Sequence, residues 1–425
     1  MNTLPRRRWL QALGASLLTA PPACRAPRRD GSRTVVDLWF SYGGTNREVL
    51  LQLVSRFNRA QPRVTVRAVF QGDYFEALAK LRTALAAGVA PALSHVVGEV
   101  VPYLAGAGVL EALDGYEGAR SLPLVRALAQ SGSYLGGDRH PLVAIPFNRS
   151  TPVLYANARM LADAGLRAPD TWDALREAAT RLTRRDGADV RWGYEVPISW
   201  WFWVAMVGQA GGSVLDTEGR ATLGGEAGVK ALRFWQELVH ERRVMRPPPG
   251  RDYNAWQAAN QDFLAGRAAM VMTSSAFLRY LERNASFPVT VAPVPSDVRA
   301  AVPTGGTFFV VLKQAPTAER EAAWRFLRWM CEADQTLYWA TRTGYLPVAT
   351  DAVARLESEG YYRSHPHDRV ALDQLRDVQP WPWSPGLFRV QRDAVEPRLE
   401  EAVLTQRDAR AVLDEARAAA REDAS

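Results

Sequence analysis

The residues best suited to binding a ligand are aromatic and lie in two groups. Residues 199–203 read Ser-Trp-Trp-Phe-Trp, and Trp381 and Trp383 form the second group. Large flat apolar rings pack on the carbon face of sugars and polyols, and they also surround quaternary ammonium groups. Consecutive residues of a helix point in different directions. We therefore expect one or two of these rings to line a ligand cleft and the others to pack in the core.

Motifs of catalysis do not appear in the sequence. It contains no phosphate-binding P-loop, no dinucleotide-binding glycine pattern, no nucleophile elbow and no HExxH zinc motif. His365 and His367 are close together, but we expect a solvated loop there and predict no metal and no cofactor. We expect a binding protein and not an enzyme. A secreted hydrolase acting on sugars or phosphodiesters is an alternative. The catalytic carboxylates of such an enzyme lie close together in the fold and need not be close in the sequence.

The net charge of +7 does not indicate a nucleic-acid partner. Basic and acidic residues alternate through most of the chain, as at 181–186, and form no basic stripe. No nucleic-acid-binding motif is present. We therefore expect the protein not to bind nucleic acid.

Residues 1–30 have the features of an export signal. The arginines at 6–8 precede a short apolar stretch at 10–20, which is followed by small residues and prolines. The arginine pattern resembles a twin-arginine (Tat) signal, and an ordinary Sec signal is the alternative. Cys24 is a candidate for lipid attachment, although Pro21 stands where lipoprotein signals usually carry Leu. We expect a periplasmic protein, with Cys24 as the candidate site of a lipid anchor.

The order of the elements predicts an α/β fold. A strand at 35–40, a helix that begins with the capping box Thr45–Glu48 and a strand at 64–70 form a βαβ unit, which requires parallel strands. Further strands are predicted at 93–97, 142–147, 151–156, 268–272, 288–292 and 307–313, and helices at 171–182, 225–241, 254–264 and 317–332.

The length of 425 residues exceeds one ordinary domain. The return of short strands at 288–313 suggests that the chain crosses back into its first domain. We predict two α/β lobes with the ligand between them. Lobe 1 comprises 34–147 and 278–329, and lobe 2 comprises 150–276 and 335–420.

Residues 145–175, IPFNRSTPVLYANARMLADAGLRAPDTWDAL, resemble the extracellular solute-binding protein family 1 of ABC importers. In that family a strand ending in Tyr-Asn leads to a helix, then Gly-Leu, then a Thr-Trp that starts the next helix. Other matches cover most of the chain in order, including 263–270 and 343–347. Within the family, the chain is most similar to members that bind glycerol 3-phosphate and glycerophosphodiesters such as glycerophosphocholine.

The resemblance implies a type II periplasmic-binding-protein fold with crossing hinge segments. It also implies closure on a small-molecule ligand, delivery to the transmembrane subunits of an ABC permease, and a monomer. Carried over by residue, it implies polar contacts from Tyr74, Ser150, Ser274 or Ser275, Gly306 and Tyr345, stacking on Trp201, and a phosphate contact from Arg389; Glu99, next to the aligned position, is a further candidate.

The chain departs from those members at two positions. Gly98 stands where they carry the Glu that binds glycerol hydroxyls, so Glu99 is the nearest carboxylate. The segment after Leu387 is shorter, so Arg389 and Arg392 are both candidates for the phosphate contact. An oligosaccharide or another polyol is therefore the alternative ligand.

Overall fold

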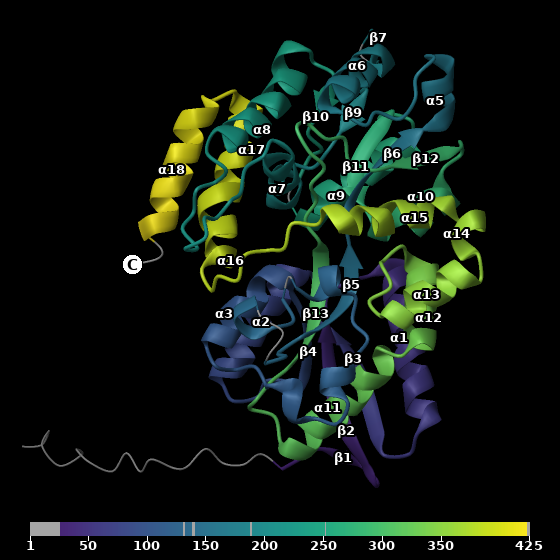
Figure 1. The fold of residues 1–425 in the computed structure, drawn as a ribbon, viewed down its shortest axis with the longest axis vertical. Coiled ribbons are helices and arrows are strands. Elements are labelled where there is room, and N and C mark those ends of the chain that lie inside the picture. Colours follow the sequence, from purple (N-terminus) through teal and green to yellow (C-terminus); the bar gives the residue numbers. More distant parts are fainter. Residues whose placement is uncertain (1–25, 131, 138–140, 188, 251, 423–425) are drawn as a thin grey trace, which may run out of the picture.

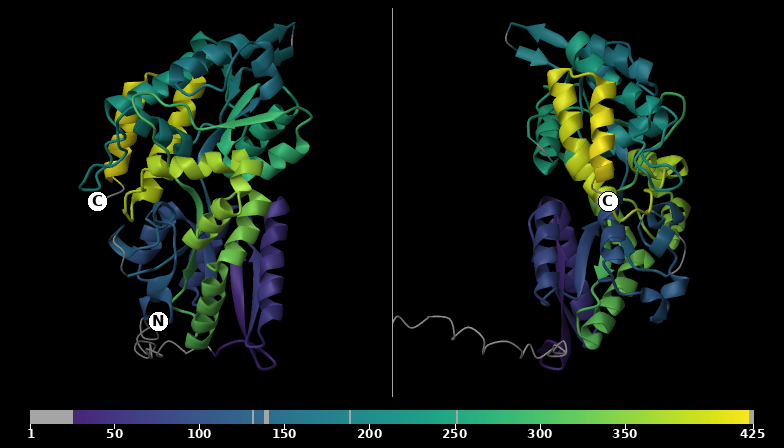
Figure 2. Two further views of the ribbon diagram at one scale, coloured as in Figure 1. Left: turned by 45° about the vertical axis from the view of Figure 1, so that its right-hand side comes forward. Right: turned by 90° about the vertical axis from the view of Figure 1, so that its left-hand side faces the viewer.

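The computed structural model describes residues 26–130, 132–137, 141–187, 189–250 and 252–422. The protein has the two-lobed type II periplasmic-binding-protein fold (Figure 1), as predicted. Each lobe is built on its own sheet. In Figure 1 lobe 1 lies below and lobe 2 above, and Figure 2 shows the same stacking from two other directions.

Lobe 1 holds a mixed sheet in the order β3-β2-β4-β13-β5, with β1 paired to β2. β2 is parallel to β3 and β4, whereas β13 is antiparallel to β4 and β5. Helices α1 and α11 cover one face, and α2 and α3 cover the other. The bounds are β1 Arg29–Asp30, β2 Arg33–Phe40, α1 Gly44–Ala60, β3 Val64–Phe70, α2 Tyr74–Ala86, β4 Leu93–Val97, α3 Val101–Gly106, α4 Arg126–Ala129, β5 Ile145–Ser150, β13 Gly305–Val311 and α11 Thr317–Met330.

Lobe 2 holds the sheet β10-β9-β11-β6-β12. Its strands are β6 Pro152–Asn157, β9 Tyr194–Glu195, β10 Met245–Arg246, β11 Met270–Ser274 and β12 Val289–Ala292, with the hairpin β7 Arg184–Asp186 and β8 Asp189–Arg191 outside the sheet. Its helices are α5 Ala158–Asp163, α6 Trp172–Leu182, α7 Trp200–Gln209, α8 Glu226–Gln236, α9 Asp252–Leu264, α10 Leu278–Asn284, α15 Pro366–Asp373, α16 Leu387–Arg389, α17 Glu396–Thr405 and α18 Ala409–Glu422.

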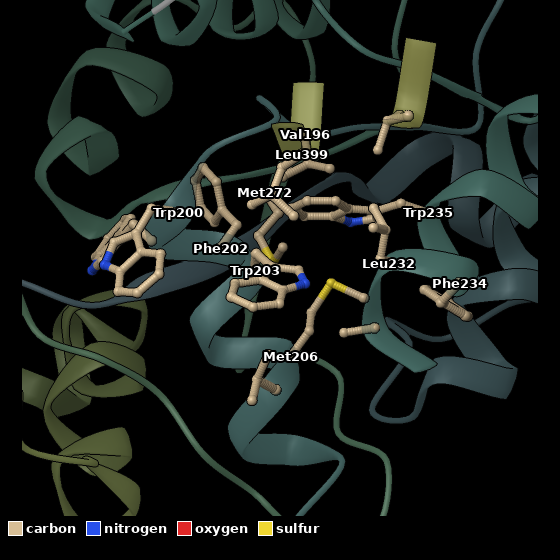
Figure 3. Packing of buried hydrophobic residues seen from close by; sticks show 14 of the residues in the cluster. Val196, Trp200, Phe202, Trp203, Met206, Leu232, Phe234, Trp235, Met272 and Leu399 are labelled. Carbon is tan, nitrogen blue, oxygen red and sulfur yellow. The ribbon is translucent and has the colours of Figure 1, made fainter. Parts of the chain in front are cut away.

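Most of the aromatic run at 200–203 lies in the core of lobe 2. Trp200, Phe202 and Trp203 have no exposed surface. Figure 3 shows Trp203 and Met206 of α7 packed near Trp235 of α8. These residues belong to the apolar cluster that joins α7 and α8 to α17 and α18. Most side chains of the run therefore hold α7 in the core. This agrees with the expectation that consecutive residues of a helix point in different directions and cannot all line a cleft.

The predicted lobe boundaries differ from the observed sheet pairing. β12 pairs with β6 in lobe 2, so the return to lobe 1 occurs at β13 and not at residue 278. Helix α12 (Ala333–Thr343) begins near the expected start of lobe 2, yet its Trp339 contacts Phe147 of lobe 1, with ring centroids 4.5 Å apart. Alternating strands and helices predict an α/β class, but they do not say which sheet a strand joins.

The beginning of the folded chain also differs from the prediction. Arg29 and Asp30 form β1 and pair with β2, so the fold starts inside the expected export segment 1–30. The arginines at 6–8 and Cys24 lie outside the described residues.

Hydrogen bonds hold together the segments that cross between the lobes. The first crossing joins β5 to β6, the second joins β12 to β13, and the third follows α12 and continues through α13 (Thr350–Ser358) and α14 (Tyr361–Ser364). The Leu346 N–H donates to the Arg149 carbonyl at 2.7 Å, and the Gln379 N–H donates to the Val302 carbonyl at 2.9 Å. The crossings therefore form one connected hinge region.

The segment 381–388 contacts both lobes. Trp381 stacks on Trp200 of lobe 2, with centroids 6.1 Å apart. Trp383 and Phe388 pack against the apolar cluster that lies between the lobe 1 sheet and helices α2 and α3. Phe388 is 6.0 Å from the ring of Phe75 on α2. The Pro- and Trp-rich sequence thus serves as an aromatic bridge between the lobes.

The hinge requires glycine at position 306, and we predict that Gly306→Ala destabilises the protein by about 3 kcal/mol or more. Gly306 has φ +93°, and a Cβ there would lie 1.8 Å from the Asn148 carbonyl oxygen. The matched control is Gly219→Ala, because Gly219 has φ +79° but a Cβ there would have no atom within 4 Å. This substitution should cost about 1 kcal/mol of stability. Denaturant unfolding of both variants measures the difference. Equal losses would contradict the steric argument.

Candidate functional site

Asn148 organises the polar groups on the lobe 1 side of the hinge. Its amide nitrogen donates to the hydroxyls of Tyr74 and Tyr345, each at 3.3 Å. Its carbonyl oxygen accepts from the backbone N–H of Thr307 at 2.6 Å and from the Thr307 hydroxyl. Burial raises the pKa of both Tyr74 and Tyr345, which also hydrogen bond to each other. The two phenols are therefore neutral hydroxyls at ordinary pH.

The start of α2 fixes the position of Tyr74. Asp73 caps the helix, and its carboxylate accepts from the backbone N–H groups of Phe75 and Glu76 at 2.8 Å. Glu76 completes the capping box by accepting from the Asp73 N–H. Tyr74 is the first residue of the helix and so extends from a rigid end.

Trp201 is the residue of the aromatic run that meets the hinge. It is 9% exposed, and its ring lies so close to Gly305 that a Cβ there would be 2.7 Å from the indole Cζ2. Gly305 pairs with Ser150 at the end of β5. Trp201 also stacks on Trp256 of α9, with centroids 5.3 Å apart. The predicted residues Trp201, Ser150 and Gly306 are thereby brought to one place.

Tyr253 and Trp256 of α9 are aromatic residues that the sequence analysis did not identify. Tyr253 is 48% exposed, and its phenol helps to raise the pKa values of Tyr74 and Tyr345, after the larger effect of their burial. Its ring centroid is 6.4 Å from that of Phe277. Helix α9 therefore brings aromatic side chains of lobe 2 close to Trp201 and Phe277. Neither residue stands in a motif, so only the fold reveals them.

Glu99 and Arg149 place opposite charges beside this site. Burial raises the pKa of Glu99 to about 7, Arg149 lowers it, and Glu396 of lobe 2 raises it further. Arg149 is completely buried, and burial lowers its pKa to about 10, so its guanidinium is charged at neutral pH. Arg149 lies within the NRST sequence, but our prediction used only Ser150 of that motif.

The adjacent serines have different roles. The Ser274 hydroxyl accepts from the Ala276 N–H at 3.1 Å and so caps the next helical turn. The Ser275 hydroxyl is buried and has no hydrogen-bond partner within the described part of the chain. Ser275 also lines a small cavity together with Tyr345 and Tyr155. Of the two, Ser275 has the hydroxyl that is available for another partner.

The predicted phosphate contact, Arg389, is the last residue of α16, which contacts the turn Gly98–Val100. Its side chain is exposed, and no hydrogen bond or ion pair joins it to the described residues. Arg392 lies over the Phe75 ring of lobe 1 at 3.8 Å and donates to Glu396 at 2.7 Å. It lines a pocket with Ser199, at the start of α7. The geometry therefore places Arg392, the alternative, at the junction of the lobes.

Among the residues that the structure describes, no group of three or more His, Cys, Asp or Glu side chains could hold a metal ion. No helix in this part of the chain is long and apolar enough to cross a membrane.

We predict that Glu99→Gln becomes more stable relative to the parent protein as the pH rises. The folded pKa of about 7 exceeds the ordinary 4.5, so the stabilising contribution of this carboxyl is present below pH 4.5 and is lost as the pH approaches about 7. Burial raises the pKa of Glu195 to about 7 as well, so the difference between variant and parent isolates Glu99. Unfolding temperatures at pH 5 and pH 8 measure it. A difference that is the same at both pH values would contradict the prediction.

Comparisons with known proteins identify the family of the chain. The model of the family described as bacterial extracellular solute-binding protein matches residues 52–367. The sn-glycerol-3-phosphate-binding periplasmic protein UgpB of Pectobacterium atrosepticum is 25% identical over 402 residues, which cover 90% of this chain and 89% of that protein.

Solved structures show the same fold. UgpB from Mycobacterium tuberculosis, in complex with glycerophosphocholine, has a TM-score of 0.80 and 25% identity, covering 91% of this chain and 98% of that one. The GacH receptor of Streptomyces glaucescens, studied unliganded and with acarbose, has a TM-score of 0.79 and 20% identity, covering 92% and 98%. The chain belongs to the bacterial extracellular solute-binding protein family, whose members bind small molecules and deliver them to ABC permeases.

Proposed function

We propose that the protein captures glycerol 3-phosphate or a glycerophosphodiester, such as glycerophosphocholine, for an ABC importer. The observation that carries the proposal is the meeting of the Asn148, Tyr74 and Tyr345 hydrogen-bond network with the Trp201 ring at the hinge. The phenols offer hydroxyl contacts to glycerol, and the indole offers an apolar face to its carbon chain. Ser150, Ser275 and Gly306 add polar groups nearby.

The charges favour an anionic ligand. Arg392 and Arg149 are cations at the junction, and a guanidinium can hold phosphate through two hydrogen bonds. Glu99, with its pKa of about 7, can accept from a hydroxyl of the ligand when ionised. One relative is named as a glycerol-3-phosphate-binding protein and another is solved with glycerophosphocholine, and both of these molecules carry a negatively charged phosphate group.

The proposed mechanism is hinge closure without covalent chemistry. A ligand that contacts both lobes stabilises the closed arrangement, which the permease then recognises. The protein acts as a monomer in the periplasm, exported by the predicted signal, and functions in binding rather than catalysis. A turnover assay with sugars and phosphodiesters tests the hydrolase alternative.

An oligosaccharide is the second candidate ligand. Exposed Tyr253 and Trp256, which stacks on Trp201, provide further aromatic rings on α9, and sugars bind on such rings. Isothermal titration with glycerol 3-phosphate, glycerophosphocholine and a maltooligosaccharide separates the candidates. Heat from the sugar alone would overturn the glycerophosphate proposal.

We predict that Trp201→Ala weakens ligand binding at least tenfold, about the value of one stacking contact and its burial. The control is Trp192→Ala, because Trp192 lies in lobe 2 beside Arg185 and away from the hinge. Titration of both variants with the ligand of the parent protein measures the effect. Unchanged affinity in Trp201→Ala would remove this residue from the site.

Single substitutions of the two C-terminal arginines should separate their roles. We expect Arg392→Ala to weaken binding of phosphate ligands at least tenfold, because Arg392 lies at the lobe junction, and Arg389→Ala to weaken it less than threefold. The same titrations measure both. A larger loss in Arg389→Ala would instead assign the phosphate contact to Arg389.

A further inference from the structure

We propose that Arg149 is the fixed positive charge that selects anionic ligands, and that it acts from beneath the site without touching the ligand. This inference rests on the proposed function. It concerns a residue that the family resemblance did not assign, and it explains an otherwise unfavourable feature of the hinge.

The unfavourable feature is a buried charge with neutral partners. The Arg149 side chain is 0% exposed; its Nη1 donates to the Gly306 carbonyl at 2.9 Å and its Nη2 donates to the Thr304 hydroxyl at 2.6 Å. Its Nε is buried without a partner in the described part of the chain. The guanidinium lies 4.3 Å from the centre of the Phe308 ring.

Two other part-buried arginines of the protein, Arg279 and Arg246, have carboxylate partners. Arg279 pairs with Asp368 at 2.6 Å and with Glu282 at 2.7 Å. Arg246 pairs with Glu195 at 2.9 Å. Arg149, although more deeply buried, forms no ion pair within 4.0 Å with any residue that the structure describes. A buried charge without a direct ion pair is costly, and an anion placed nearby would offset that cost.

The position of Arg149 relates the charge to the proposed site. Asn148 and Ser150 flank it in β5, and its backbone pairs with Gly306. The guanidinium interacts electrostatically with Glu99 and Tyr74. It therefore lies directly behind the groups that would surround a ligand. Over the short distances of such a site, one charge at the dielectric of a protein can change anion affinity about tenfold or more.

A purely structural role for Arg149 predicts a different outcome. Its carbonyl accepts from Leu346, and its side chain binds Thr304 and Gly306, so the residue contacts each crossing segment. A hinge residue of this kind would alter the affinity for every ligand to the same extent. Ligands of different charge therefore distinguish the two roles.

The test compares Arg149→Gln, which keeps hydrogen-bond donors but removes the charge, with Arg149→Lys, which keeps the charge. Titrations use glycerol 3-phosphate, a dianion near neutral pH, and glycerophosphocholine, whose net charge is zero. We expect Arg149→Gln to weaken binding of glycerol 3-phosphate at least tenfold and binding of glycerophosphocholine less than threefold. Arg149→Lys should stay within threefold of the parent protein for both.

Equal losses for both ligands in Arg149→Gln, or no recovery of dianion binding in Arg149→Lys, would overturn the inference. If Arg149→Gln does not fold, Thr304→Val replaces it, since it removes one hydrogen bond and leaves the charge. An unchanged affinity of Thr304→Val for glycerol 3-phosphate then supports the role of the Arg149 charge. Equal losses of affinity for both ligands refute that role and assign Arg149 to the hinge alone. If the parent protein binds neither phosphate ligand, the proposed function itself is overturned. That result is obtained before any variant is compared, so the two failures can be told apart.

Discussion

The antiparallel pairing of β13 with β5 is the constraint on which the rest of the structure depends. It joins two chain segments that both pass from one lobe to the other, and it contains the irregularity between Gly306 and Phe308. This pairing brings Asn148, Arg149 and Ser150 next to the glycines at 305 and 306. The absence of side chains at those glycines lets Trp201 approach from lobe 2 and lets the Asn148 carbonyl lie close.

The sequence was sufficient to predict much of this arrangement. The βαβ pattern predicted the α/β class, and the resemblance at 145–175 predicted two lobes with crossing segments. Six of the residues named from the resemblance, Tyr74, Glu99, Ser150, Trp201, Gly306 and Tyr345, lie around one part of the hinge in the structure.

Other features could not be predicted because they depend on three-dimensional pairing. The sheet that β12 joins is decided by its contacts with β6, since its valines would suit either sheet. The direction in which Arg389 and Arg392 point depends on the helical turns after Gly386. The segment after Leu387 is shorter than in the similar family members, so the resemblance could not fix that direction. Asn148 and Arg149 stand in a recognisable motif, but their contacts with Tyr74, Tyr345 and Thr304 come from distant parts of the chain.

The aromatic bridge at 381–388 has a consequence for the time that a solute stays bound. A motion that parts the lobes while this segment stays rigid would pull Trp381 from Trp200 or withdraw Trp383 and Phe388 from lobe 1. Either change would expose apolar rings to water. The residence time of the solute is thus governed in part by an apolar contact within the protein, and warming or mild denaturant would change the release rate even for ligands of identical affinity.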